Sequence, residues 1–103
     1  MIVVMNVVTV AEENRAAFEE RFQTRERLLD QAEGFAGFEL LKRDVDGGGE
    51  YSVLTRWESR EAFQGWVKSD LFARAHRRDR EEGSVAATNE LRTYEVIDAQ
   101  VPA

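Results

Sequence analysis

The opening run of residues 2–10 constrains the fold most, because it is rich in valine and apolar on both of its faces. Such a run predicts a β-strand. Side chains alternate along a strand, so one face carries Ile2, Val4, Asn6, Val8 and Val10, and the other carries Val3, Met5, Val7 and Thr9. One layer of helices covers only one face of a small sheet. We therefore expect a second layer of protein over the other face.

The rest of the chain alternates between helical and strand patterns. Residues 12–32 predict a helix with an inner stripe and a stop at Gly34; the stripe is Phe18, Phe22, Arg25 and Leu29. Residues 35–44 and 50–57 predict a hairpin around an Asp-Gly-Gly-Gly turn. Ser59 is a typical N-cap for a helix over 60–68, and a further helix over 69–80 and a last strand over 88–97 complete the pattern.

The order β-α-β-β-α-β predicts a ferredoxin-like α+β fold, in which a four-stranded antiparallel sheet carries both helices on one face. A chain of 103 residues has room for one core, so residues 1–103 are predicted to form a single domain. Two copies packed sheet to sheet would cover the second face of the first strand. This predicts a homodimer in the form of an α+β barrel.

Composition argues against several partners and kinds of site. A net charge of −6 and a pI near 4.8 argue against nucleic acid as the main partner. The absence of cysteine excludes disulfides, thiolate ligands and iron–sulfur clusters. The N-terminal run has no positive charge before it and is interrupted by Asn6, so we expect neither a signal peptide nor a membrane span and place the protein in the cytoplasm. Motifs of zinc proteases, serine hydrolases and nucleotide-binding loops are absent from the sequence.

His76 is the single histidine of the chain and lies in a basic stretch; residues 74–80 hold four arginines and one acid. A neutral imidazole can ligate iron, and the alternative is an exposed or hydrogen-bonded histidine on a helix. The arginines suit a small anion or form a solvated helix face. Trp66 either walls a cofactor site or packs in the core or an interface.

Asn6 is a polar residue in an apolar strand, where an unpaired buried amide costs about 1–3 kcal/mol. Its partner is backbone, water or a ligand, and its NH2 group can donate a hydrogen bond to an iron-bound dioxygen without adding charge. Arg25 falls in the stripe of the first predicted helix, with Arg21 on its flank. Either arginine pairs with a ligand carboxylate between the helices, or it forms an ion pair or extends into solvent.

Several short segments together are similar to one known family. They are Arg21-Phe22-Gln-Thr-Arg25, Gly34-Phe35-Ala-Gly37-Phe38, Val53-Leu54-Thr55-Arg-Trp57-Glu-Ser59, Glu61-Ala62-Phe63-Gln-Gly-Trp66 and Lys68-Ser69-Asp70-Leu-Phe72-Ala-Arg-Ala75-His76. Over nearly its whole length the chain resembles the antibiotic-biosynthesis-monooxygenase superfamily. Within that superfamily it looks like the IsdG-type haem-degrading monooxygenases, because Asn6, Trp66 and His76 occur at the family's spacing.

The resemblance implies a homodimer with one haem per subunit, where haem is both substrate and cofactor. His76 would be the axial ligand of the haem iron, Asn6 would face the distal oxygen ligand and Trp66 would press the macrocycle out of plane. The remaining site residues would be Arg21, Phe22 and Arg25 along the ring and Val53 beneath it. Dioxygen and electrons from an unidentified reductase would open the ring and release iron.

Other functions remain open from the residues alone. The same fold serves cofactor-free monooxygenases that act on aromatic or quinol-like compounds without an iron ligand. A haem-binding protein without turnover would need the same residues, and a dimeric domain with a vestigial site would bind no haem.

Overall fold

The computed structural model describes residues 1–77 and 88–102, and the end of the helix predicted over 69–80 lies outside them. Four strands and three α-helices are present in the described part, together with two short 3-10 helices. The strands are β1 (Ile2–Ala11), β2 (Phe35–Val45), β3 (Gly48–Trp57) and β4 (Thr88–Glu95). The helices are α1 (Arg15–Gln23), α2 (Arg60–Val67) and α3 (Asp70–Ala75), with η1 (Glu12–Asn14) and η2 (Leu28–Gln31) on either side of α1.

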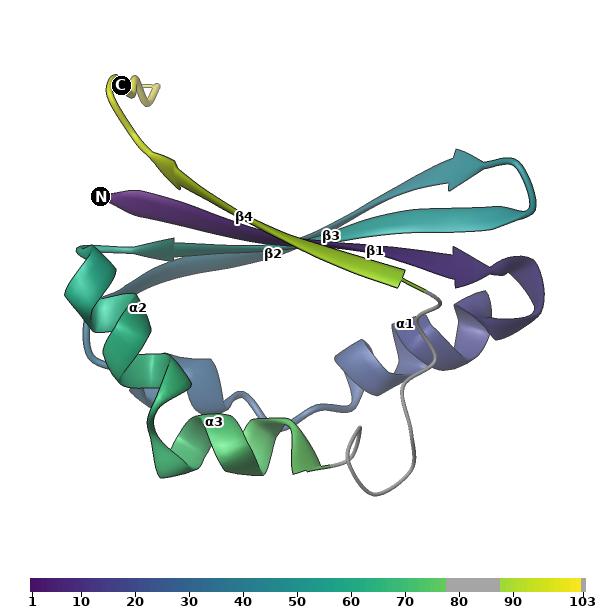
Figure 1. Cartoon of the computed structure of the whole chain (residues 1–103), viewed down its shortest axis with the longest axis horizontal. Helices are drawn as coiled ribbons and strands as arrows, with labels where there is room; N and C mark the ends of the chain where they lie inside the picture. Colours follow the sequence, from purple (N-terminus) through teal and green to yellow (C-terminus); the bar gives the residue numbers. More distant parts are fainter. Residues whose placement is uncertain (78–87, 103) are drawn as a thin grey trace.

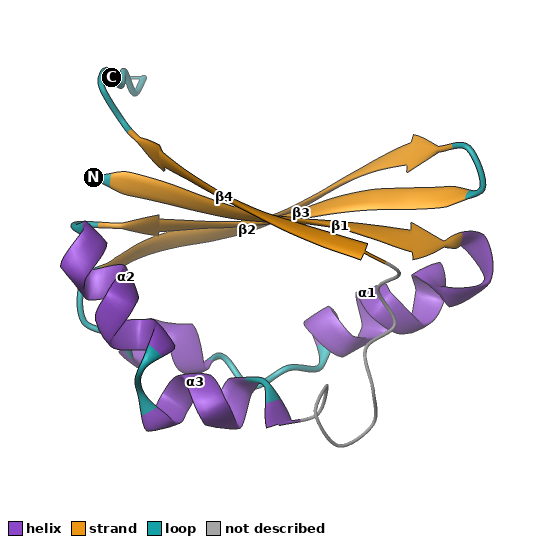
Figure 2. Ribbon diagram, in the orientation of Figure 1, coloured by secondary structure: helices purple, strands orange, loops and turns teal. Residues whose placement is uncertain are grey.

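The strands form one antiparallel sheet in the order β2-β3-β1-β4, with β1 and β3 at its centre. All the helices lie on one side of this sheet, α1 below one end and α2 and α3 below the other (Figures 1 and 2). The predicted ferredoxin-like arrangement is confirmed. The turn between β2 and β3 is tighter than predicted, because Gly47 adopts a φ of 83° there and the next two glycines already belong to β3.

The helix predicted over residues 12–32 is wrong as one continuous element. It ends at Gln23, where the Thr24 hydroxyl donates to the Glu20 carbonyl oxygen, and the chain resumes a helical turn only at η2. The break lets the segment bury its apolar side chains in two places, Phe18 under one end of the sheet and Leu28 under the other. A straight helix would have placed Phe18 and Leu28 under the same part of the sheet. Leu29, which was predicted to face inward, is only half-buried.

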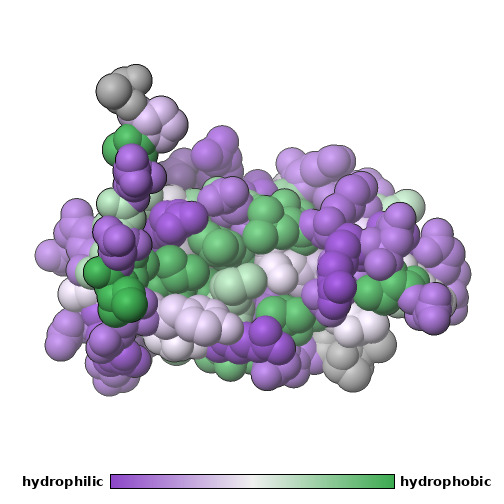
Figure 3. Space-filling view, turned by 90° about the horizontal axis from the view of Figure 1, so that it is seen from above, coloured by the Kyte–Doolittle hydropathy of each residue, from purple (hydrophilic) through white to green (hydrophobic). Residues whose placement is uncertain are grey.

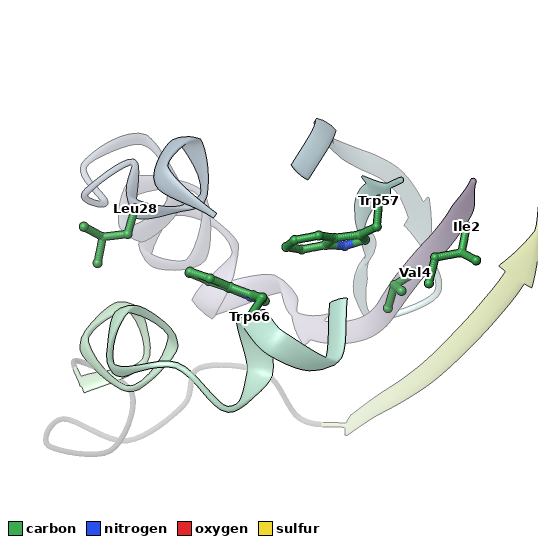
Figure 4. Close-up of a cluster of buried hydrophobic side chains, with 5 residues drawn as sticks. All are labelled: Ile2, Val4, Leu28, Trp57 and Trp66. Carbon is green, nitrogen blue, oxygen red and sulfur yellow. The ribbon is translucent and has the colours of Figure 1, made fainter. Parts of the chain in front are cut away.

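Two clusters of buried side chains lie under opposite ends of the sheet. The first contains Ile2, Val4, Leu28, Trp57 and Trp66, and the second contains Val8, Val10, Phe18 and Tyr51. Figure 4 shows Trp66 projecting from α2 between Leu28 and the fully buried Trp57. The two serine caps hold this end: Ser59 accepts from the Ala62 amide and Ser69 from the Phe72 amide, each at 3.1 Å.

The second cluster is held in place by Tyr51, a fully buried tyrosine. Its hydroxyl donates to the Glu19 carboxylate at 2.5 Å and accepts from Arg15 Nε at 3.3 Å. Burial raises the pKa of the Tyr51 phenol, and the hydrogen bond from that hydroxyl is the main cause that lowers the pKa of Glu19. Because Arg15 and Glu19 both belong to α1, this pair of bonds fastens the helix to β3.

The other face of the sheet carries an apolar centre with hydrophilic residues around it, and none of the described helices covers it (Figures 1 and 3). The centre consists of Val3, Met5, Val7, Leu41, Leu54 and Tyr94, with Leu41 and Tyr94 more than 40% exposed. The hydrophilic residues include the ion pairs Arg43–Glu50, Arg56–Glu39 and Arg92–Glu90. We call this surface the outer face. Among the described residues, no helix combines the length and apolarity needed to cross a membrane.

Candidate functional site

Asn6 lies on the helix-covered face of the sheet, between the two buried clusters. Along β1 it separates Val4 of the first cluster from Val8 of the second. Its register partners are Val53 on β3 and Leu91 on β4, which therefore share its face. Asn6 and Val53 are half-buried and Leu91 is 61% exposed. These three residues, the central strip, form a largely apolar surface with one amide in it.

His76 follows α3 directly, and its ring orientation is fixed by two contacts. Nδ1 lies 2.8 Å from the Phe72 carbonyl oxygen, and the imidazole lies against the Phe72 ring with centroids 4.0 Å apart. Because a carbonyl oxygen only accepts, Nδ1 is the donor, and in the neutral imidazole Nε2 carries a free lone pair. A fixed Nδ1–H on an exposed histidine leaves Nε2 as the nitrogen that could ligate a metal.

Trp66 is linked to His76 through Phe72. The Trp66 and Phe72 rings meet edge to face with centroids 5.8 Å apart, and the Phe72 ring in turn contacts the His76 ring. Trp66 is only 8% exposed, so its main role in the fold is that of a core residue. Through Phe72, the core supports the position of the imidazole.

Phe22 and Arg25 lie at the other side of the helical layer, against Phe38 of β2. The Phe22 and Phe38 rings are stacked with centroids 6.3 Å apart, and the Arg25 guanidinium lies 4.3 Å from the centroid of Phe38. The partial burial of Arg25 lowers its pKa, yet an arginine stays charged at neutral pH. Arg25 follows the end of α1 and does not belong to a helical stripe, whereas Arg21 lies within α1 and is half-buried.

The basic stretch is only partly described. Arg74 makes a bidentate ion pair with Glu26, Nε to Oε1 at 3.2 Å and Nη2 to Oε2 at 2.5 Å, and this pair ties α3 to the segment after α1. Arg77 is exposed, and Arg78 and Arg80 lie outside the described residues.

A surface groove of about 500 Å³ lies apart from the central strip, between η2 and α2. Glu33, Glu58 and Glu61 line it together with one edge of Trp66. Three carboxylates disfavour an anionic ligand, so this groove does not suit the propionates of a haem.

Six of the seven predicted site residues thus fall into three groups, and the seventh, Arg21, lies on α1. Asn6 and Val53 are neighbours in the sheet, Phe22 and Arg25 share contacts with Phe38, and Trp66 and His76 share contacts with Phe72. Within the described residues, no hydrogen bond or ring contact joins one group to another. Phe72 and Leu91 were not predicted as site residues. The helical spacing of Phe72 and His76 could have indicated that their side chains meet. The position of Leu91 beside Asn6 could be found only from the register of β4.

The family model for antibiotic biosynthesis monooxygenase matches residues 1–78. The chain belongs to this family. The resemblance to its haem-degrading members is confirmed as well, because such relatives share 38–40% of their residues with the chain.

Two relatives and one solved structure define that similarity. The heme oxygenase (mycobilin-producing) of Mycobacterium tuberculosis is 38% identical over 96 residues, 93% of this chain and 89% of the relative. A heme-degrading monooxygenase of Listeria welshimeri is 40% identical over 82 residues, 72% of this chain and 68% of the relative. The structure of the heme-degrader MhuD from Mycobacterium tuberculosis, with two hemes in its active site, superposes with a TM-score of 0.74 at 35% identity and covers 96% of this chain and 99% of that one.

Proposed function

We propose that this protein is a haem-degrading monooxygenase, for which haem is substrate and cofactor. The observation that carries the proposal is the state of His76: Nδ1 is held by the Phe72 carbonyl, and the residue is exposed just after the end of α3. The relatives named above, which degrade haem, share more than a third of their residues with this chain.

The described residues supply the kinds of chemical group that a haem needs. A haem needs a neutral imidazole, a broad apolar surface and cations near its propionates. His76 supplies the imidazole, Val53 and Leu91 supply apolar surface beside Asn6, and Arg25 carries a partly desolvated positive charge. We place the site between the two ends of the helical layer, with residues from the sheet, from α1 and α2, and from the segments that follow α1 and α3.

Each residue has a role that follows from its chemistry. When bound, haem supplies the iron and the conjugated ring at which dioxygen chemistry takes place. His76 would hold the iron, Asn6 would offer N–H donors to an oxygen ligand, and Arg21, Phe22 and Arg25 would bind the ring and its carboxylates. Trp66 supports the position of His76 through Phe72, and in this role it would also bear on the macrocycle. We place the protein in the cytoplasm, where an external reductase supplies the electrons.

The test is a visible spectrum of the purified protein titrated with hemin, followed by ascorbate in air with catalase present. We expect a saturable Soret band at about one equivalent per chain, because His76 is the only histidine. Addition of ascorbate should bleach the band and release iron that a ferrous chelator detects.

The other outcomes separate the competing functions. A Soret band that survives both ascorbate and an enzymatic reductase would assign the protein to haem binding without turnover. Failure to shift the Soret band would overturn the haem function and favour a cofactor-free oxygenase acting on quinol-like compounds, or a vestigial site.

We also propose that two copies pair through the outer face to form a homodimer. Met5 lies in its apolar centre, opposite Leu54, whereas Thr9 lies on the same face near the exposed end of β1. Met5→Lys should convert a dimer of twice 11.8 kDa into a monomer, because an unpaired charge would be buried in the interface. Thr9→Lys adds the same charge outside the centre and should leave the mass unchanged in light scattering. Equal masses for both variants and the native protein would contradict this interface.

A further inference from the structure

We propose that Asn89 is a positioning residue that sets the orientation of the Asn6 amide, an inference that rests on the proposed function. Asn89 lies on β4 opposite Val8, one step diagonally from Asn6. Its Nδ2 donates a hydrogen bond to Asn6 Oδ1 over 3.4 Å. The family model matches residues 1–78, so Asn89 lies outside the matched segment, on the last strand of this chain.

The hydrogen bond leaves one side of the Asn6 amide for a ligand. A primary amide accepts only at oxygen and donates only at nitrogen. With Oδ1 directed to β4, the planar amide turns Nδ2 away from β4 and over the central strip. Within the described residues, the Asn6 side chain makes no other hydrogen bond, so both Nδ2 protons remain for a bound molecule.

Asn89 is the described residue that hydrogen-bonds the Asn6 side chain, and with Asn89 Nδ2 as the donor only one orientation of the Asn6 amide accepts the bond. The residues before, after and directly opposite Asn6 on the same face are Val4, Val8, Val53 and Leu91, which are all apolar. Apolar contacts do not discriminate between an NH2 group and an oxygen of nearly the same size. A flipped amide would present Oδ1 to the bound molecule, and its lone pairs would repel those of an oxygen ligand.

Asn89 contributes little to the core, which makes the proposal testable. It is exposed and belongs to neither buried cluster. Asn89→Asp keeps the shape of the side chain but only accepts hydrogen bonds, so it should bind an Asn6 N–H and flip the amide. Asn89→Gln keeps the donor. Asn14→Asp is the matched control, because Asn14 is exposed and its side chain makes no capping hydrogen bond.

The first readout uses the ligand-free protein. The Asn6 side-chain NH2 signals in a ¹H–¹⁵N spectrum are assigned by their loss in Asn6→Ala. In Asn89→Asp, one of the two proton signals should move downfield, because it bonds to a carboxylate. It should stay in place in Asn89→Gln and in the Asn14→Asp control.

The second readout is the rate of hemin loss with ascorbate at saturating hemin. Asn89→Asp should slow it by about tenfold, since the N–H donors are turned away, while hemin affinity measured by the Soret titration changes by less than about threefold. Asn89→Gln should retain most of the rate. In an Asn6→Ala background, Asn89→Asp should have no further effect, because residues that act through one group are not additive.

The outcomes distinguish this inference from the proposed function. A native protein that degrades hemin, with Asn89→Asp degrading it equally fast and with unmoved Asn6 signals, would overturn the role of Asn89 alone. Equal losses of rate in Asn89→Asp and Asn89→Gln would also overturn it, since the donor would then be irrelevant. A native protein that bleaches no hemin would overturn the proposed function and, with it, the positioning role of Asn89 in haem degradation.

Discussion

Replacement of His76 with alanine should abolish haem degradation and shift the Soret band of the bound haem. Loss of a group that merely orients a metal ligand typically costs roughly 10- to 100-fold in affinity or activity, so loss of the ligand should cost at least about 100-fold. The fold should survive, because the ring is exposed and its contact with Phe72 is worth about 0.5–1.5 kcal/mol. Circular dichroism, the hemin titration and the ascorbate assay measure the three quantities.

Added imidazole provides the sharpest control for this variant. The alanine leaves space beside Phe72, and free imidazole should fill it and restore part of the native spectrum. Lys68→Ala, at an exposed position between α2 and α3, should leave spectrum and rate unchanged. A His76→Ala protein with the native spectrum and rate would show that the iron is held by another group.

The fold was predictable from local patterns, because each strand and cap has a short-range cause. The alternation in residues 2–10 predicted that Asn6 shares a face with Val4 and Val8, and the structure confirms it. Ser59 was predicted as an N-cap and accepts the expected bond. Periodicity failed between residues 24 and 27, where a helical spacing continues in the sequence while the backbone does not. The break depends on which cluster each end of the segment joins, and no local pattern contains that information.

The sequence singled out candidate site residues, but it did not contain the contacts that hold them in place. His76 and Asn6 were recognisable as unusual residues, but the Phe72 carbonyl that fixes the imidazole is a backbone group. Trp66 was predicted either to wall a cofactor or to fill the core; its burial assigns it to the core cluster, and the contact with Phe72 relates that cluster to His76. Asn89 and Leu91 follow only from the register of β4 against β1, because a shift by one residue would move both to the outer face.

Replacement of Asn6 with alanine should slow haem degradation by on the order of 100-fold, the usual effect of removing a placed hydrogen-bond donor from an active site. Hemin affinity should change little, because the imidazole, the apolar surface and the arginines proposed to bind the ring are unaltered. The free energy of unfolding should fall by only about 1 kcal/mol, since Asn6 is half-buried and, among the described residues, its side chain hydrogen-bonds only to the exposed Asn89. Soret titration, the ascorbate assay and urea unfolding measure these effects separately.

Asn6→Asp separates the loss of the donor from the loss of the side chain. Aspartate fills the same volume, but its carboxylate donates nothing and brings negative charge to the distal side. It should therefore degrade haem no faster than Asn6→Ala, although it restores the shape. If Asn6→Ala instead unfolds below ambient temperature while Asn6→Asp stays folded, the amide serves the sheet more than the ligand. If both variants fold and degrade haem at the native rate, the donor has no part in the reaction, and distal control must come from other residues along the strip.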